Sequence, residues 1–126
     1  MDKKVRYRDA QHERRCRALL NRLSVKDRSS KAFQSMIFLA TGNSELLRVF
    51  SDYFFPESGE FFFRELLEER IEDERIRTLQ KLLVQLYNGR TTVTIIEVID
   101  ALREEEDWLE LTIRAIEVRA FGIDEA

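Results

Sequence analysis

The chain has 126 residues, 44% of them hydrophobic and 36% charged, with a formal net charge of −3 at pH 7. This length fits one domain, and the abundance of Leu, Ile and Phe excludes a disordered polyelectrolyte. One proline and four glycines exclude a turn-rich β-sandwich, which would need a chain breaker about every ten residues. We therefore expect one all-α domain over residues 1–126, folded as a compact irregular bundle of five to six helices.

Cysteine usage and hydropathy indicate the compartment. The one cysteine, Cys16, cannot form an intramolecular disulfide, which is typical of a reducing environment. No apolar run approaches the roughly 18 residues of a membrane-spanning helix. The basic N-terminus is not followed by the apolar stretch of a secretory signal. We therefore expect a cytoplasmic protein that has no membrane partner.

Charge is distributed unevenly along the chain. Residues 1–31 contain eleven Lys and Arg against four Asp and Glu, a balance of +7. Residues 32–126 contain ten basic and twenty acidic residues, a balance of −10, so that the two parts sum to −3. A basic segment on an acidic body is typical of proteins that act through contact with charged partners. Residues 1–8 are predicted to be a basic N-terminal arm and residues 123–126 a loose tail.

Two helices are predicted from the start of the chain to residue 42. Asp9 is the N-cap of the first, which runs to about Leu23. Its apolar residues gather on one side, at Ala18, Leu19, Leu20 and Leu23. The second helix follows three cap candidates, Asp27, Ser29 and Ser30. It ends at Gly42, because glycine is favoured just after the last helical residue.

Aromatic residues dominate the middle of the chain. Asn43 or Ser44 begins a third helix, and Pro56 and Gly59 stop it. Residues 60–69 open with three phenylalanines that could begin a strand but continue with good helix formers, so we predict a short helix. So small a core cannot easily hide every ring of this region, and partner surfaces are enriched in aromatic residues. We predict partner contacts for Phe55, Phe61 and Phe62, the alternative being that the rings cover one end of the core.

The second half of the chain predicts further helices. Asp73 is the N-cap of the clearest one, which ends at Asn88 and Gly89. Residues 94–97, Thr-Ile-Ile-Glu, have the form of a capping box, and residues 107–110, Asp-Trp-Leu-Glu, repeat the signature. The final helix aligns four apolar residues on one side: Leu109, Ile113, Ile116 and Ala120. The pattern leaves open whether residues 94–120 form one helix or two.

His12 and Cys16 are the first candidates for chemistry, since residues four apart share one face of a helix. A structural zinc site needs four ligands, and the chain has no second His or Cys. A catalytic Cys–His pair on an Arg-rich helix would also lack a third group to orient it. We therefore expect a half-buried thiol beside a solvent-facing imidazole. The sequence predicts a protein that is not an enzyme, with no catalytic residue, metal site or cofactor.

Acidic residues crowd into two stretches of the second half. They lack the spacing of a calcium-binding loop, and several occupy favourable positions near helix N-termini. One interpretation is a set of solvated helix faces. The other is an acidic surface that imitates a phosphate backbone and occupies a basic groove of a partner protein. For the second interpretation, the predicted partner-binding residues are Glu68, Glu69, Glu72, Asp73, Glu104, Glu105, Glu106 and Asp107.

The basic N-terminal helix suggests two alternatives. Arginine exceeds lysine in this region, which favours bidentate recognition of phosphate or carboxylate. A nucleic-acid-binding regulator would use Arg14, Arg15, Arg17 and Arg22. A structural or self-associating component would instead dock its basic arm on the acidic body of a neighbouring copy. The sequence leaves open whether the protein is a monomer or a homodimer.

Two helix ends have distinctive sequences. Residues 38–46 read Phe-Leu-Ala-Thr-Gly-Asn-Ser-Glu-Leu, an apolar helix followed by Gly-Asn and Leu. Residues 83–89 read Leu-Val-Gln-Leu-Tyr-Asn-Gly and precede an acidic loop and a terminal helix that ends at Arg119. Together they resemble a family of uncharacterised small proteins from phages and mobile elements of Gram-positive bacteria. The similarity spans roughly residues 10–122.

This resemblance implies a compact helical protein made by a phage or mobile element in the cytoplasm of its host, and it transfers no catalytic residue. Small anti-defence inhibitors, such as anti-CRISPR proteins, are one class of such proteins. The leading hypothesis is therefore a non-enzymatic inhibitor of a nucleic-acid-guided defence nuclease. Its acidic helices would occupy a groove meant for DNA, and its exposed aromatic residues would anchor the contact.

Overall fold

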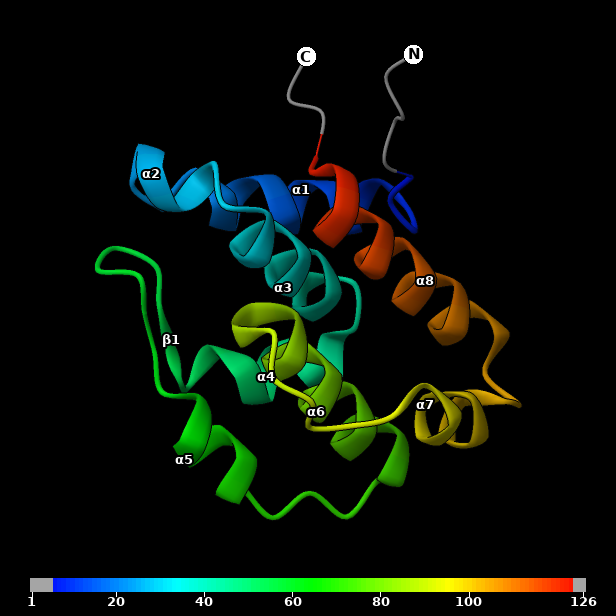
Figure 1. The fold of residues 1–126 in the computed structure, drawn as a ribbon. Coiled ribbons are helices and arrows are strands. Elements are labelled where there is room, and N and C mark those ends of the chain that lie inside the picture. Colours follow the sequence, from blue (N-terminus) through cyan, green and yellow to red (C-terminus); the bar gives the residue numbers. More distant parts are fainter. Residues whose placement is uncertain (1–5, 124–126) are drawn as a thin grey trace.

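The fold is organised around one buried helix. The computed structural model describes residues 6–123, which form eight helices and a two-stranded hairpin (Figure 1). Helix α3 (Lys31–Thr41) is buried along residues 34–41 and packs against α1 (Ala10–Leu20), α6 (Glu74–Asn88) and α8 (Glu106–Phe121). A helix that is buried on all sides is stable only inside such a set of neighbours. The expected all-α class is confirmed in outline, but the described residues contain more helices than expected and a small sheet.

The N-terminal layer contains one more helix than predicted. Asp9 caps α1 as expected, since its carboxylate accepts a hydrogen bond of 2.8 Å from the backbone N–H of His12. The predicted second helix is α3, which begins after Ser30, one of the three predicted caps, and a short helix that was not predicted, α2 (Val25–Arg28), precedes it. Ser24 and Ser30 cap them with their hydroxyl groups. Each serine bonds the N–H three residues later, which stops one helix from running into the next.

The middle of the chain corrects the prediction of a single short helix over residues 60–69. Helix α4 (Ser44–Ser51) leads into a hairpin of β1 (Phe54–Phe55) and β2 (Glu60–Phe61), and α5 (Phe63–Glu68) follows. Gly59 closes the hairpin turn with a φ of +77°, a conformation that glycine adopts at little cost. Antiparallel pairing sets Phe54 opposite Phe61, and both rings enter the core.

The C-terminal part forms two helices across residues 94–120. Helix α7 (Ile95–Leu102) begins with the predicted capping box, in which Thr94 and Glu97 bond each other's backbone N–H groups. Helix α8 begins one residue before the predicted Asp107 cap, after Glu105, which makes no side-chain capping bond. A Cβ on Gly42 would lie 2.4 Å from a methyl carbon of Leu111, so glycine lets α8 approach the end of α3 closely.

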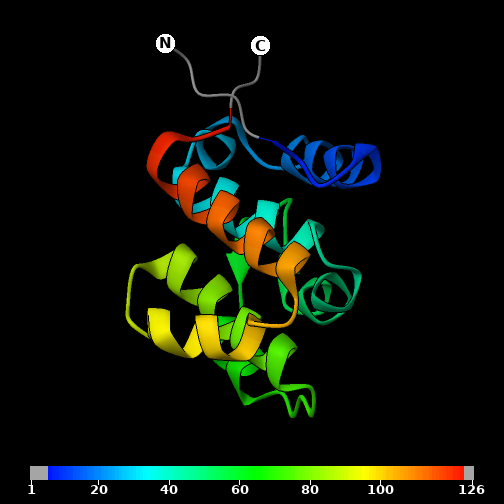
Figure 2. The ribbon, with the colours of Figure 1, turned by 90° about the vertical axis from the view of Figure 1, so that its right-hand side faces the viewer.

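The two ends of the described chain lie side by side (Figures 1 and 2). In the predicted arm, Tyr7 packs on Phe38 with ring centroids 5.6 Å apart, and Arg8 donates a 2.6 Å hydrogen bond to the carbonyl of Gly42. In the predicted tail, the N–H of Ile123 donates a 2.8 Å bond to Gln34. These residues are therefore bound to the helical body, whereas residues 1–5 and 124–126 lie outside the described part. Between residues 6 and 123, no helix has the length and apolar character needed to cross a membrane.

Candidate partner-binding surface

The two acidic stretches meet in space at one arginine. Arg75, in the first turn of α6, contacts Asp73 with a 2.8 Å ion pair and also pairs with Glu105 in the loop between α7 and α8. Its guanidinium group lies 4.6 Å from the ring centre of Trp108, within the range of a cation–π interaction. Arg75 thus joins residues that are about thirty positions apart in the chain. We call the eight predicted acidic residues on these two stretches the acidic surface.

Three members of the acidic surface serve the fold itself. Asp73 caps α6 with a 2.9 Å bond from the N–H of Arg75, and hydrogen bonds from the Arg75 side chain lower the pKa of Asp73 to about 2. Glu105 accepts from the same arginine. Glu69 accepts a hydrogen bond from the hydroxyl of Tyr53, which raises the pKa of that tyrosine. These carboxylates hold the two stretches in place.

The other five members point into solvent. They are exposed and have no ion pair within residues 6–123: Glu68, Glu72, Glu104, Glu106 and Asp107. Residues 68–77 contain five acidic and three basic residues, and residues 103–107 contain four acidic residues and one basic residue. The two stretches together therefore have a net charge of −5. Five carboxylates free of internal partners, on two stretches that Arg75 joins, can attract a basic partner.

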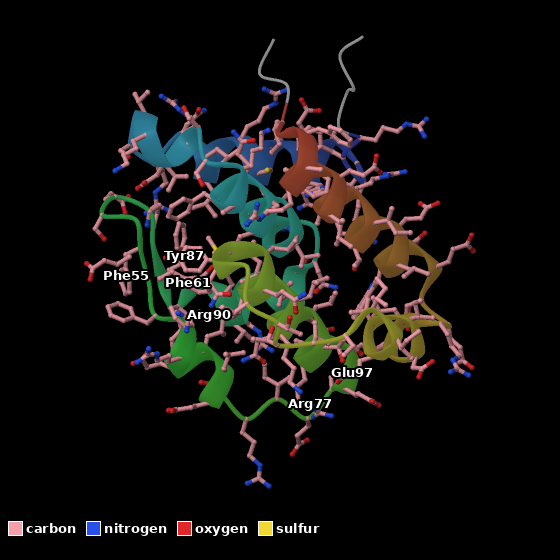
Figure 3. All side chains as sticks on the ribbon, viewed as in Figure 1. Phe55, Phe61, Arg77, Tyr87, Arg90 and Glu97 are labelled. Atoms are coloured by element: carbon pink, nitrogen blue, oxygen red, sulfur yellow. The ribbon has the colours of Figure 1, made fainter. Side chains whose placement is uncertain are left out.

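The predicted aromatic residues divide between the surface and the core. Phe55 and Phe62 are exposed and contact each other edge to face, with ring centroids 5.6 Å apart. Phe61 is only 7% exposed, and its ring points toward Tyr87 at 5.0 Å (Figure 3). Strand pairing turns Phe61 inward, so we leave it out of the partner surface. Phe55 lies on the side of the molecule opposite α7 in Figure 3, so the aromatic pair is separated from the acidic stretch that follows α7, whereas Glu68 is on α5, which directly follows Phe62.

Three of the four arginines predicted for nucleic-acid binding have partners within the protein. Arg17 forms a 2.9 Å ion pair with Glu13, and Arg22 forms one of 2.6 Å with Glu57. Arg15 donates a 3.2 Å bond to Ser44, whereas Arg14 is exposed. Internal carboxylates thus already occupy two of the four guanidinium groups. This arrangement weakens the case for a phosphate-binding row along α1.

His12 and Cys16 do share a face of α1, but that face is buried. The imidazole is 3% exposed, which corrects the expectation that it faces solvent. Its Nδ1 accepts a 3.0 Å bond from the N–H of Arg8, so Nε2 carries the proton and donates to the carbonyl of Phe38 at 2.9 Å. Burial raises the pKa of the Cys16 thiol to about 12. Neither residue is placed to reach a substrate, and within the described residues no three His, Cys, Asp or Glu are grouped to hold a metal ion.

Protonation of His12 is expected to destabilise the protein below about pH 6.5, the ordinary value for histidine. Burial lowers the pKa of His12 despite the nearby Asp9, while Arg8 and Arg114 add to the effect. Below pH 6.5 the unfolded chain binds a proton that the native state excludes. The free energy of unfolding therefore falls as the pH is lowered, by up to about 1.4 kcal/mol per pH unit. Urea unfolding at pH 7.5, 6.5 and 5.5 measures this. The chain has one histidine, so a His12→Gln variant should remove most of the dependence in this range.

The sequence analysis missed a second surface, on α7 and α8. The aligned residues Ile113 and Ile116 do not pack into the core. The buried side of α8 is instead a second apolar stripe, formed by Leu111, Ala115 and Val118. The run Ile95-Ile96 at the start of α7 also remains exposed. The sequence does contain a signal for this surface. Helices α7 and α8 each have apolar residues over a wider arc than is needed to pack one face against the core.

Comparisons of the chain with protein-family models, with curated proteins and with solved structures gave no match.

Proposed function

We propose that this protein is a non-enzymatic inhibitor, made by a phage or mobile element, of a nucleic-acid-guided defence nuclease of the host. In this proposal the acidic surface occupies a groove lined by Arg and Lys that otherwise holds DNA, in the manner of an anti-CRISPR protein. The observation that supports it is the joining of the two acidic stretches by Arg75 and Trp108, while five carboxylates of these stretches remain exposed.

The physical basis is the resemblance between such a surface and a nucleic acid. DNA presents about one negative charge per 1.7 Å of its axis, and DNA-binding proteins neutralise these charges with Arg and Lys side chains. Guided nucleases hold their nucleic acids in positively charged channels by contacts to the backbone. A rigid surface of carboxylates competes for such a channel without any chemical step. The burial of His12 and Cys16, the groups best suited to nucleophilic chemistry, agrees with a binding role.

Inhibition of purified, guide-loaded nucleases tests the proposal directly. The protein is added to a panel of such nucleases before labelled target DNA, and DNA binding and cleavage are both measured. We expect loss of DNA binding by at least one nuclease, competitive with DNA and weakened by salt. Inhibition of cleavage while DNA binding stays intact would contradict occupation of the DNA groove.

A gel shift separates this function from that of a nucleic-acid-binding regulator. A regulator should shift free DNA or RNA at low salt and lose the shift when Arg14, Arg15 and Arg17 become Glu. The proposed inhibitor should shift none of them and bind a basic protein.

A further inference from the structure

The four residues before α1 lie over His12. We call residues 6–9 the strap, and none of them belongs to a helix or a strand. The ring of Tyr7 packs edge to face against that of His12, with ring centroids 5.2 Å apart. The same ring packs against Phe38 of α3 at 5.6 Å. Because His12 is only 3% exposed, the strap is part of what keeps water from its imidazole.

Mostly polar contacts hold the rest of the strap in place. The guanidinium group of Arg8 donates a 2.6 Å hydrogen bond to the carbonyl of Gly42, just after α3. From α8, Arg114 donates a 3.3 Å bond to the carbonyl of Arg6. Arg8 and Asp9 also line a cleft of about 220 Å³ against the N-terminal half of α8. A segment held by one ring and a few hydrogen bonds beside solvent can open while the helices stay folded.

One contact of the strap depends on the charge of His12. The backbone N–H of Arg8 donates a 3.0 Å hydrogen bond to Nδ1, and Nε2 donates one of 2.9 Å to the carbonyl of Phe38. Nδ1 can accept only while the imidazole is neutral, because both nitrogens of the protonated ring carry a proton. Protonation therefore replaces the Arg8 bond by a contact between two donors, which weakens the hold of α1 on the strap.

The surroundings of His12 oppose protonation while the strap is closed. The groups that face it come from the strap, α1, α3 and α8: Tyr7, Arg8, Asp9, Cys16, the carbonyl of Phe38, and Arg114. Helix α3 has no charged side chain after Lys31. Burial lowers the pKa of His12, and the positive charges of Arg8 and Arg114 add to this effect, whereas the bond to the α3 carbonyl and the charge of Asp9 oppose it. Once the strap opens, water reaches the imidazole and its pKa returns towards the ordinary value of about 6.5.

We propose that the strap is a pH-sensitive switch: it is closed over a neutral His12 and is released when the imidazole takes up a proton. This opening is local, because the strap detaches while α3, α6 and α8 stay folded, and it does not depend on the proposed function. Since the open state takes up the proton more readily, its population rises as the pH falls. From pH 7.5 to 5.5, a group that titrates near 6.5 in the open state and stays neutral in the closed state raises the opening constant about 10-fold.

Hydrogen exchange of single amides tests the switch in the unaltered chain. Exchange is followed by NMR at pH 7.5 and 5.5 and is expressed as protection factors, which removes the effect of pH on the intrinsic exchange rate. The amide of Arg8 reports the strap, and we expect its protection to fall about 10-fold. Leu83 is buried in α6 and reports unfolding of the whole fold. Its amide should stay at least about 10-fold more protected than that of Arg8 at both pH values.

The amide of Thr92 is the matched control. It lies in the loop between α6 and α7 and donates a 3.0 Å bond to the side chain of Gln85, the same length as the bond from Arg8 to His12. The glutamine side chain does not titrate, so the protection of Thr92 should change less than about 2-fold between the two pH values.

Two variants separate the proton from the other contacts of the strap. His12→Gln keeps an oxygen that can accept from the Arg8 N–H and an amide that can donate to Phe38, but it does not titrate. The protection of Arg8 should then change less than about 2-fold with pH. Arg8→Gln removes the bond to the Gly42 carbonyl and keeps the backbone N–H. It should lower the protection of residue 8 at both pH values and retain the ratio of about 10-fold. Thermal unfolding monitored by circular dichroism verifies that both variants remain folded.

Three results would overturn the switch. The first is protection of Arg8 that does not change with pH, or a fall of equal size at Thr92. The second is a fall that persists in His12→Gln, since another group would then be responsible. The third is equal protection of Arg8 and Leu83 at each pH, which would mean that His12 acts only through unfolding of the whole chain. None of them changes the expected outcome of the nuclease assay, which depends on the acidic surface.

Discussion

Loss of nuclease inhibition is the expected result of replacing Glu68, Glu72 and Glu104 together with lysine. These residues come from both acidic stretches, are exposed, and have no ion pair within the described part of the chain. They also lie outside the first turn of any helix, so reversal does not oppose a helix dipole. The change sets lysines against the proposed basic groove. We expect affinity to fall at least about 100-fold in a calorimetric titration, because like charges at an interface cost several kcal/mol.

A second triple variant separates the surface from overall charge. Glu13, Glu57 and Glu60 lie on α1 and the hairpin, away from the loop between α7 and α8 (Figure 1). Their replacement by lysine changes the net charge by the same amount, and the exposed ion pairs that it breaks contribute about 1 kcal/mol or less each. This control should retain inhibition to within a few-fold. If both variants lose inhibition equally, net charge rather than the acidic surface is responsible.

Phe38→Ala is expected to cause the largest loss of stability of any single substitution considered. Phe38 is fully buried on α3, with its ring 4.6 Å from that of His12 and 5.6 Å from that of Tyr7. Its removal leaves a cavity where α1, α3 and the start of the described chain meet. We expect the free energy of unfolding to fall by about 3–5 kcal/mol, a large part of the usual total of about 5–15 kcal/mol. Urea denaturation at pH 7.5 measures it.

Phe55→Ala is the matched comparison for this substitution. It removes the same aromatic ring from a position that is 47% exposed, in contact mainly with Phe62. We expect a loss below about 1 kcal/mol, because half of the ring is already in water. Equal losses for the two variants would contradict the placement of α3 at the centre of the core.

Local signals predicted the fold well. Asp9, Asn43 and Thr94 cap helices as expected, because each bonds an N–H three residues away and needs nothing from the rest of the chain. The start of α8 was predicted less well. Glu105 precedes it without a capping bond and is held by Arg75, a contact that depends on how α6 and α8 are placed.

Features that depend on tertiary packing could not be predicted. Helix α8 has two apolar sides, and only its contact with α3 decides that Leu111 is buried while Ile113 is exposed. Phe61 is turned inward by its pairing with Phe54, and the sequence of three phenylalanines does not specify that register. Of the candidate surface, the sequence identified the acidic residues but not their meeting at Arg75, nor the exposed apolar residues of α7 and α8.

The burial of Cys16 means that its reactivity reports local opening of the fold around α1. The thiolate is the reactive form of cysteine, and Cys16 has no exposed surface and a pKa of about 12. An alkylating reagent at neutral pH therefore reaches the sulfur only when α1 detaches, and the rate of labelling measures that opening without denaturant. A second cysteine introduced at the exposed position of Ile96 can then be labelled alone in the folded protein, on the exposed apolar side of α7.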